Sequence, residues 1–236
     1  MAKNTDGLAI VAAAIGVILI GSKSDEVIKK VIKKIVIMAE TNFSETLAKS
    51  YIDKYNTLVL SKKFTNEANN FLIKVLANKQ VYLDIQQATG VPWYFTATLH
   101  MRESGCSYAR HMHNGDPLAA KTYHEPPGYP KAPPANGKFY TFLESAIDSF
   151  QYQGFNKKKD WSLAKMIYLL EVYNGKGYLS NNLINPYLWS GTQYYSTGKF
   201  IEVKQSNGKF KGVYKSNLVD AQLGAVPFLK MLLNAK

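Results

Sequence analysis

The sequence predicts an α+β fold that is mainly α, with one small β-hairpin, preceded by a helical stalk and an N-terminal membrane helix. Residues 40–85 are rather polar and contain neither Gly nor Pro, which predicts two or three consecutive helices. The dipeptide Asn207-Gly208 separates two strand-like runs, a pattern typical of a hairpin. Further helices are expected at Trp93–Ser104, Phe139–Phe150, Ser162–Tyr173 and Asp220–Leu233.

The membrane helix is expected because Gly7–Gly21 (GLAIVAAAIGVILIG) carries no charge. As a helix it would cover roughly 22 Å, less than the roughly 30 Å of a bilayer's hydrocarbon core. A short anchor, the apolar stretch of a secretion signal and a buried helix are the three interpretations. The poor basic flank, with Lys3 alone, and the lack of a clean cleavage site near Gly21 weaken the signal interpretation. We therefore predict a membrane-associated segment at residues 1–24.

The next stretch, Val27–Ala39 (VIKKVIKKIVIMA), places apolar residues at helical spacing and its lysines on the opposite face. A basic amphipathic helix of this kind lies in the headgroup layer of a membrane, or packs its apolar stripe on the protein's own core. The lysines that follow the apolar segment favour a cytoplasmic location for the C-terminal side. The predicted organisation is a membrane segment at residues 1–24, a helical stalk at 25–85 and a separate domain at 86–236.

The amino-acid composition limits the classes of binding partner that we expect, but it does not single out one of them. The net charge of +12 predicts attraction to nucleic acid, anionic lipid or a bacterial cell wall. The single cysteine, Cys106, excludes an internal disulfide. Sixteen tyrosines suit a groove that stacks on flat, half-polar ligands such as sugar rings, and they equally suit an ordinary core. The Pro/Gly-rich stretch between Pro117 and Gly137 is expected to form a long loop.

Glu103 is the candidate with the clearest chemical role. If Trp93–Ser104 is a helix, Phe95, Leu99 and Glu103 share one face, which we expect to point into the domain. Gly105 is suited to end the helix, so Glu103 would lie in the last turn beside unpaired carbonyls. Burial and the helix end both disfavour the charged carboxylate and raise its pKa, as a general acid requires. The alternative is a Glu paired with a nearby Lys or Arg.

Several motifs follow one another in an order that resembles the lysozyme-like superfamily. They are HMRES, HMHNGDPL, EVYNGKGY, NPYLWSGTQYYSTGKF and DAQLG, and the resemblance covers residues 91–233. The Glu-Ser helix end and the later Tyr-Asn-x-Gly turn are similar to those of goose-type lysozymes and lytic transglycosylases. The resemblance implies a lysozyme-like domain that cleaves the β-1,4 bond between N-acetylmuramic acid and N-acetylglucosamine.

The same resemblance implies roles for particular residues. Glu103 would be the general acid or acid/base, and the substrate groove would involve Ser104, Tyr173, Asn174 and Gly175. The Gly-Leu-Met-Gln element that follows the Glu-Ser pair in transglycosylases is missing here, so hydrolysis and transglycosylation both stay open. No cofactor is expected, and the expected partner is bacterial peptidoglycan rather than a specific nucleic acid.

A second carboxylate and three aromatic residues are further candidates. Asp116, in Asn114-Gly115-Asp116-Pro117, is expected to be exposed on a tight turn and ionised. There it either activates water or stabilises the oxocarbenium-like transition state, or it simply closes the turn with a hydrogen bond. Tyr187 and Trp189 follow a Pro and precede a Gly, which predicts a ligand-exposed loop that stacks on sugar. For Trp93, core packing is the favoured interpretation.

Two other classes of function stay open. The four histidines, His100, His111, His113 and His124, lie close together in the sequence, near Glu103 and Cys106. Imidazoles and a carboxylate are ligands of catalytic zinc, so a zinc-dependent wall peptidase or amidase is one alternative, although no His-Glu-x-x-His motif is present. The other is a non-catalytic membrane or ejection protein of a virion. The expected location is a membrane, either the internal membrane of a phage virion or the bacterial inner membrane and periplasm.

Overall fold

The computed structural model describes residues 43–124, 126–206, 208 and 210–235, which belong to one compact unit. The predicted membrane segment Gly7–Gly21 and the basic stretch Val27–Ala39 lie outside these residues. In the described part of the chain, no helix is long and apolar enough to cross a membrane.

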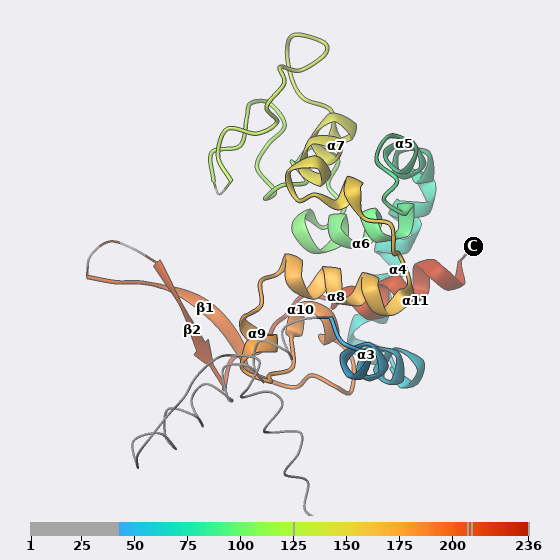
Figure 1. Cartoon of the computed structure of the whole chain (residues 1–236), viewed down its shortest axis with the longest axis vertical. Coiled ribbons are helices and arrows are strands. Elements are labelled where there is room, and N and C mark those ends of the chain that lie inside the picture. The colour runs from blue at the N-terminus through green and yellow to red at the C-terminus, as the bar shows by residue number, and fades with distance from the viewer. Residues whose placement is uncertain (1–42, 125, 207, 209, 236) are drawn as a thin grey trace, which may run out of the picture. The chain divides into compact units, whose positions relative to one another are not determined.

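The described unit is mainly helical and contains one small antiparallel sheet of two strands (Figure 1). This confirms the predicted class of secondary structure. The elements are α3 (Glu45–Thr57), α4 (Lys62–Ala77), α5 (Lys79–Thr89), α6 (Trp93–Ser104), α7 (Phe142–Tyr152), η1 (Phe155–Lys157), α8 (Leu163–Tyr173), α9 (Gly177–Ser180), α10 (Pro186–Trp189), β1 (Lys199–Lys204), β2 (Phe210–Lys215) and α11 (Ala225–Asn234).

The stretch without Gly or Pro forms α3, α4 and α5, as its composition predicts. The Ser44 side chain accepts a hydrogen bond from the Leu47 N–H and so caps the start of α3. Gly90, in the left-handed conformation, ends α5. α3 packs against α8, and α5 packs against α6 and α7. The described residues of the predicted stalk therefore share one compact unit with residues 86–235.

α6 lies at the centre of this unit and packs against α5 and α11 (Figure 1). Most of its residues are buried, and Phe95 and Leu99 are fully buried. The helix ends at Gly105, whose φ of 61° is left-handed and whose N–H donates to the Met101 carbonyl at 3.1 Å. Both predicted ends of this helix, and the role of the glycine, are confirmed.

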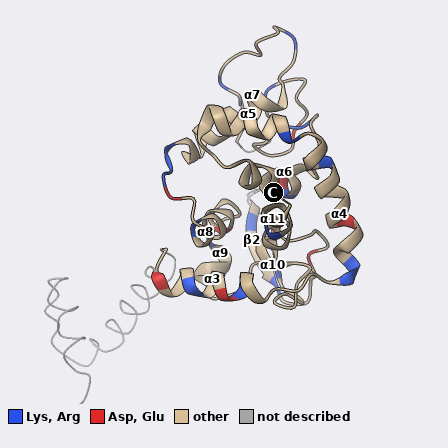
Figure 2. Ribbon diagram, turned by 90° about the vertical axis from the view of Figure 1, so that its right-hand side faces the viewer, with Lys and Arg blue, Asp and Glu red and all other residues tan. Residues whose placement is uncertain are grey.

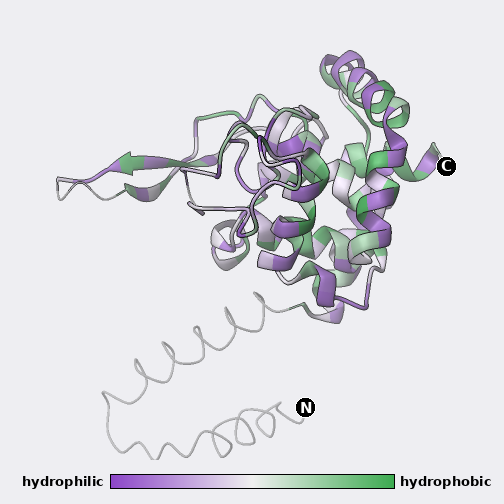
Figure 3. Cartoon of the chain, turned by 90° about the horizontal axis from the view of Figure 1, so that it is seen from above, coloured by the Kyte–Doolittle hydropathy of each residue, from purple (hydrophilic) through white to green (hydrophobic). Residues whose placement is uncertain are grey.

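The hairpin also forms where the sequence predicts it. β1 and β2 pair antiparallel, with Lys199 opposite Lys215 and Lys204 opposite Phe210. Figure 3 shows the two strands extending away from the helices. Lys and Arg positions are distributed over several elements rather than gathered on one of them (Figure 2).

The last helix is shorter than its pattern predicts. α11 begins at Ala225 and not at Asp220, so the predicted start is wrong. Asp220 instead accepts a hydrogen bond from the Gln222 N–H and pairs with Arg102. These side-chain interactions hold the chain in a non-helical conformation ahead of the first helical turn.

Candidate active site

Glu103 stands in the last turn of α6, on the face that Phe95 and Leu99 bury in the core. Its own side chain is half-buried. The hydroxyl of Tyr187, from α10, donates a hydrogen bond to Glu103 Oε1 at 2.8 Å. Residues from two distant parts of the chain therefore meet at this carboxyl group, and the predicted inward direction of the helix face is confirmed.

The pKa of Glu103 lies above its ordinary value. Burial raises it, while the hydrogen bond from Tyr187 and the positive charge of Arg102 offset part of the rise. Arg102 is not an ion-pair partner of Glu103: it pairs with Asp220 at 3.4 Å and donates to the Leu223 carbonyl at 2.8 Å. The rise in pKa that burial predicts is thus confirmed, and no Lys or Arg in the described part of the chain forms an ion pair with Glu103.

Tyr187 and Trp189 do not lie on an exposed loop, so that prediction is wrong. They belong to the short helix α10, and only 5% and 3% of their surfaces are exposed. The Asn185 side chain accepts the Tyr187 N–H at 2.9 Å, and Pro186 occupies the first position of the helix. Trp189 packs edge-on against Tyr194. Tyr187 meets Glu103 through its hydroxyl, and neither ring is placed to stack on a sugar.

The end of α8 brings a second tyrosine towards Glu103. The Tyr173 hydroxyl donates to the Met112 carbonyl at 3.2 Å. Burial raises the pKa of Tyr173 well above its ordinary value, and the nearby charge of Glu103 raises it further. The Asn174 amide donates to Asn185 Oδ1 at 3.3 Å, and Gly175 turns the chain with a φ of 92°. Ser104, in contrast, donates its hydroxyl to its own helix, at the carbonyl of His100.

Asp116 is buried, with 4% of its surface exposed, and the expectation of an exposed carboxylate is wrong. Its oxygens accept hydrogen bonds from the Asn114 amide, the backbone N–H groups of Tyr123 and His124, and the His124 ring. Burial raises the pKa of Asp116, but these hydrogen bonds and the charge of His124 outweigh it and lower the pKa to about 2. The carboxylate is therefore ionised, as expected, and it holds the loop together.

The Asp116 loop lies directly against the end of α6. Gly115 has a φ of 78°, and a Cβ added to it would come within 3.2 Å of the Glu103 carbonyl oxygen. A side chain at this position would be strained by the left-handed backbone and would sit tightly against the helix end. The two candidate carboxylates therefore belong to adjacent backbone segments, although their side chains have different partners.

Each of the four histidines forms a hydrogen bond with another described residue. His100 is buried in the core, bonded to the Tyr82 hydroxyl and stacked on Phe142. His111 bonds Ser145 and the Ala120 carbonyl, while His113 bonds Asp148. Among the described residues, no three His, Cys, Asp or Glu side chains converge as a metal site would require. The zinc alternative therefore lacks a set of donors in this part of the chain.

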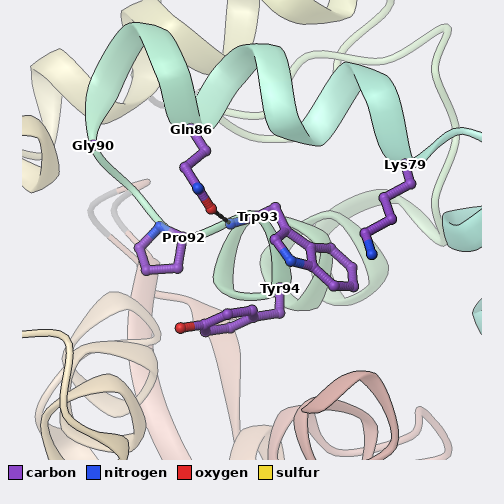
Figure 4. Close-up of a pocket in the computed structure, with 6 residues that line it drawn as sticks. All are labelled: Lys79, Gln86, Gly90, Pro92, Trp93 and Tyr94. Carbon is purple, nitrogen blue, oxygen red and sulfur yellow. Dashed lines mark hydrogen bonds between the residues drawn. The ribbon is translucent and has the colours of Figure 1, made fainter. Parts of the chain in front are cut away.

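Trp93 is buried, as the core interpretation predicts, and stands beside a shallow hollow at the other end of α6. The Lys79 ammonium lies 4.5 Å from the centre of its indole ring. The Gln86 side chain accepts a hydrogen bond from the backbone N–H of Trp93 at 2.8 Å (Figure 4). This hollow is lined by Lys79, Gln86, Gly90, Pro92, Trp93 and Tyr94, and it contains neither Glu103 nor Tyr187.

The sequence pattern did not lead us to two buried charged residues near the candidate active site, Arg102 and Glu171. The Arg102 guanidinium lies 4.5 Å from the ring centre of Tyr187 and so supports the tyrosine that bonds Glu103. Glu171, two positions before Tyr173, is buried and bonded to Tyr51 of α3. A charged residue inside an otherwise apolar helix pattern was the available signal for Glu171.

No family model, curated protein or solved structure matches this chain.

Proposed function

We propose that this protein cleaves the β-1,4 bond between N-acetylmuramic acid and N-acetylglucosamine in peptidoglycan, with Glu103 as general acid. One observation carries the proposal: Glu103 is a half-buried carboxyl group with a raised pKa, held by a tyrosine hydroxyl at a glycine-ended helix. A carboxylic acid that keeps its proton towards neutral pH can protonate the oxygen of a departing sugar. The lysozyme-like resemblance of the flanking motifs supports the same chemistry.

The two oxygens of the Glu103 carboxyl group differ in their contacts, and we propose a different role for each. Tyr187 bonds Oε1, whereas no described residue bonds Oε2. In the proposed reaction Oε2 carries the proton to the glycosidic oxygen, and Tyr187 fixes the orientation of the carboxyl group. As the carbon–oxygen bond breaks, positive charge develops on the sugar and the newly formed Glu103 carboxylate stabilises it.

Asp116 is assigned a structural role in this proposal. A carboxylate that activates water needs a free oxygen directed at the substrate. Four donors already occupy Asp116, and they come from its own loop. We therefore assign the second step of the reaction to no particular carboxylate.

The test is to incubate the protein with purified peptidoglycan and identify the fragments by mass spectrometry. Fragments with reducing-end sugars identify a hydrolase, and fragments with 1,6-anhydro sugars identify a transglycosylase. Cut peptides with intact glycan strands would overturn the glycosidase proposal. E103Q is the key variant, and E45Q, at an exposed glutamate in the first turn of α3, is its matched control.

We also propose that the chain is attached to a membrane through residues 7–21, assisted by residues 27–39. The support is the uncharged segment Gly7–Gly21 and the lysine-rich amphipathic pattern after it. A variant that lacks residues 1–24 should stay in the supernatant, while the full chain should sediment with membranes unless detergent is added. Equal solubility of both chains without detergent would overturn the proposal. Whether the membrane belongs to a phage virion or to the bacterial envelope is decided by fractionation of each.

A further inference from the structure

Tyr123 and His124 are two exposed aromatic residues in the long loop between α6 and α7 (Figure 1). Tyr123 is 67% exposed, and 70% of the His124 side chain is exposed. Their rings lie against each other, with 4.4 Å between the ring centres. Rings as exposed as these add little to the core, and neither has a role in the proposed acid step.

The buried carboxylate of Asp116 holds both residues in place. Its Oδ2 accepts hydrogen bonds from the backbone N–H groups of Tyr123 at 2.9 Å and of His124 at 3.0 Å. Its Oδ1 accepts a third hydrogen bond, from Nδ1 of the His124 ring, at 2.6 Å. The two backbone bonds are sufficient to close the loop. The third bond fixes the orientation of a ring that lies largely in solvent, as the support of a ligand-binding residue does.

The backbone on either side of the pair is held as well. Thr122 is buried, its N–H donates to the Tyr129 carbonyl at 2.7 Å, and its carbonyl accepts from the Gly128 N–H at 2.7 Å. The Asn114 amide donates to the His124 carbonyl at 3.1 Å. The two rings are therefore presented by a pre-formed backbone, and a ligand that binds them has little of the loop left to order.

The chemistry of the pair fits a sugar. An aromatic face binds the C–H face of a pyranose ring, while polar groups at the edge of the ring bind hydroxyl and amide groups. Because the ionised Asp116 can only accept, His124 Nδ1 donates to it, and Nε2 of the neutral ring is left as an acceptor. Lys121, two positions before Tyr123, is exposed and adds a positive charge that complements the carboxylates of muramic acid.

The pair also belongs to a loop that packs against the end of α6. Gly115 precedes Asp116, and a Cβ added to it would come within 3.2 Å of the Glu103 carbonyl oxygen. We propose that Tyr123 and His124 form a binding site for the glycan strand beside Glu103, with Asp116 as the residue that positions both rings. This inference rests on the proposed function and names a part of the protein that holds the substrate.

The test measures binding in the absence of cleavage. The full-length E103Q variant, in detergent, is titrated by calorimetry with glycan strands that have been freed of their peptides. In this background Y123A and H124A should each weaken binding by roughly tenfold, because each removes one ring from a pre-formed site. Y123F keeps the ring face and should bind as E103Q does. F210A is the matched control: Phe210, on β2, is 64% exposed, and its loss should leave the affinity unchanged.

Unchanged affinity in Y123A and H124A, or an equal loss in F210A, would overturn the proposal. Tighter binding of a single-stranded oligonucleotide through the same rings would also overturn it, since nucleic-acid bases stack on aromatic side chains too. Cleavage of peptidoglycan by the unchanged protein is measured separately. A chain that binds glycan strands through these rings without cleaving them refutes the proposed function and keeps the binding site. A chain that cleaves them, with binding that does not depend on the rings, refutes the binding site alone.

Discussion

Glu103 and Asp116 are two carboxyl groups on adjacent backbone segments, and the protein moves their pKa values in opposite directions. Glu103 is half-buried and Asp116 is almost fully buried. Burial disfavours the charge on both, yet only the pKa of Glu103 ends above its ordinary value. Burial alone therefore does not explain the difference.

The number of hydrogen-bond donors explains it. Asp116 accepts from two backbone N–H groups, an amide and an imidazole, each of which stabilises the ionised form. Among the described residues, Glu103 has one donor, the Tyr187 hydroxyl, because the nearby Arg102 is committed to Asp220 and to the Leu223 carbonyl. The comparison separates a carboxylate that stabilises a loop from a carboxylic acid that is available for chemistry.

The largest effect is expected at Glu103 itself. E103Q keeps an acceptor for the Tyr187 hydroxyl but cannot donate an acidic proton, so the rate on peptidoglycan should fall by about 10²- to 10⁴-fold. The release of soluble glycan fragments measures this rate, and circular dichroism checks that the fold is kept. E45Q should keep the full rate. Undiminished activity of E103Q would remove Glu103 from the reaction.

Asp116 should instead control stability. D116N replaces one acceptor oxygen with a donor that faces the backbone N–H groups of Tyr123 and His124, so it should cost about 1–3 kcal/mol of unfolding free energy. Urea unfolding measures the loss, and D53N, at an exposed aspartate paired with Lys49, is the control that should cost less than about 1 kcal/mol. A D116N variant with full stability and no activity would show that Asp116 acts in the reaction.

The same carboxylate predicts a dependence of stability on pH. The pKa of Asp116 is about 2 in the folded protein and 3.8 as the ordinary value, so its folded pKa is depressed. Its contribution is fully present above pH 3.8 and is lost as the pH falls towards 2. D116N should lack this part of the acid-induced loss, which parallel urea titrations of both proteins would detect.

Local sequence patterns were enough to predict the surroundings of Glu103. The helical spacing of Phe95, Leu99 and Glu103 and the position of Gly105 gave the helix, its inward face and its end, because these depend on neighbours in the sequence. The hairpin at Asn207-Gly208 was predicted for the same reason. The lysozyme-like fold that the resemblance implies stays a prediction.

The burial of Asp116 and of Trp189 depends on contacts between distant segments of the chain, which a single sequence does not reveal. The burial of Asp116 requires the chain to return at Tyr123 and His124. Trp189 is buried on α10, which packs against α8 and α11, and no local sequence pattern indicates that packing. Turn-forming residues on both sides of α10 instead suggested a loop, since the Asn185 cap and Pro186 start a helix as readily as a turn.

A smaller effect is expected from Y187F. This variant tests directly whether a hydrogen-bond donor sets the pKa of Glu103. Losing the only hydroxyl donor to Glu103 among the described residues should raise the pKa of Glu103, because that hydrogen bond lowers it. Activity falls as the acid loses its proton, so the alkaline limb of the kcat profile should move to higher pH. The control is Y173F, which leaves the Tyr187 hydroxyl in place. A limb that moves to lower pH in Y187F would show that Tyr187 does not stabilise the Glu103 carboxylate.

The smallest effect is expected from H124A, which removes one of the hydrogen-bond donors to Asp116. The His124 ring bonds Asp116 at 2.6 Å, but 70% of that side chain is exposed, so water replaces much of the lost interaction. The backbone N–H groups of Tyr123 and His124 and the Asn114 amide stay in place. The loss of unfolding free energy should therefore stay below about 1 kcal/mol, with a rise in the pKa of Asp116 because the hydrogen bond from the ring lowers that pKa. A loss as large as that of D116N would mean that one exposed ring, and not the set of donors, keeps Asp116 ionised.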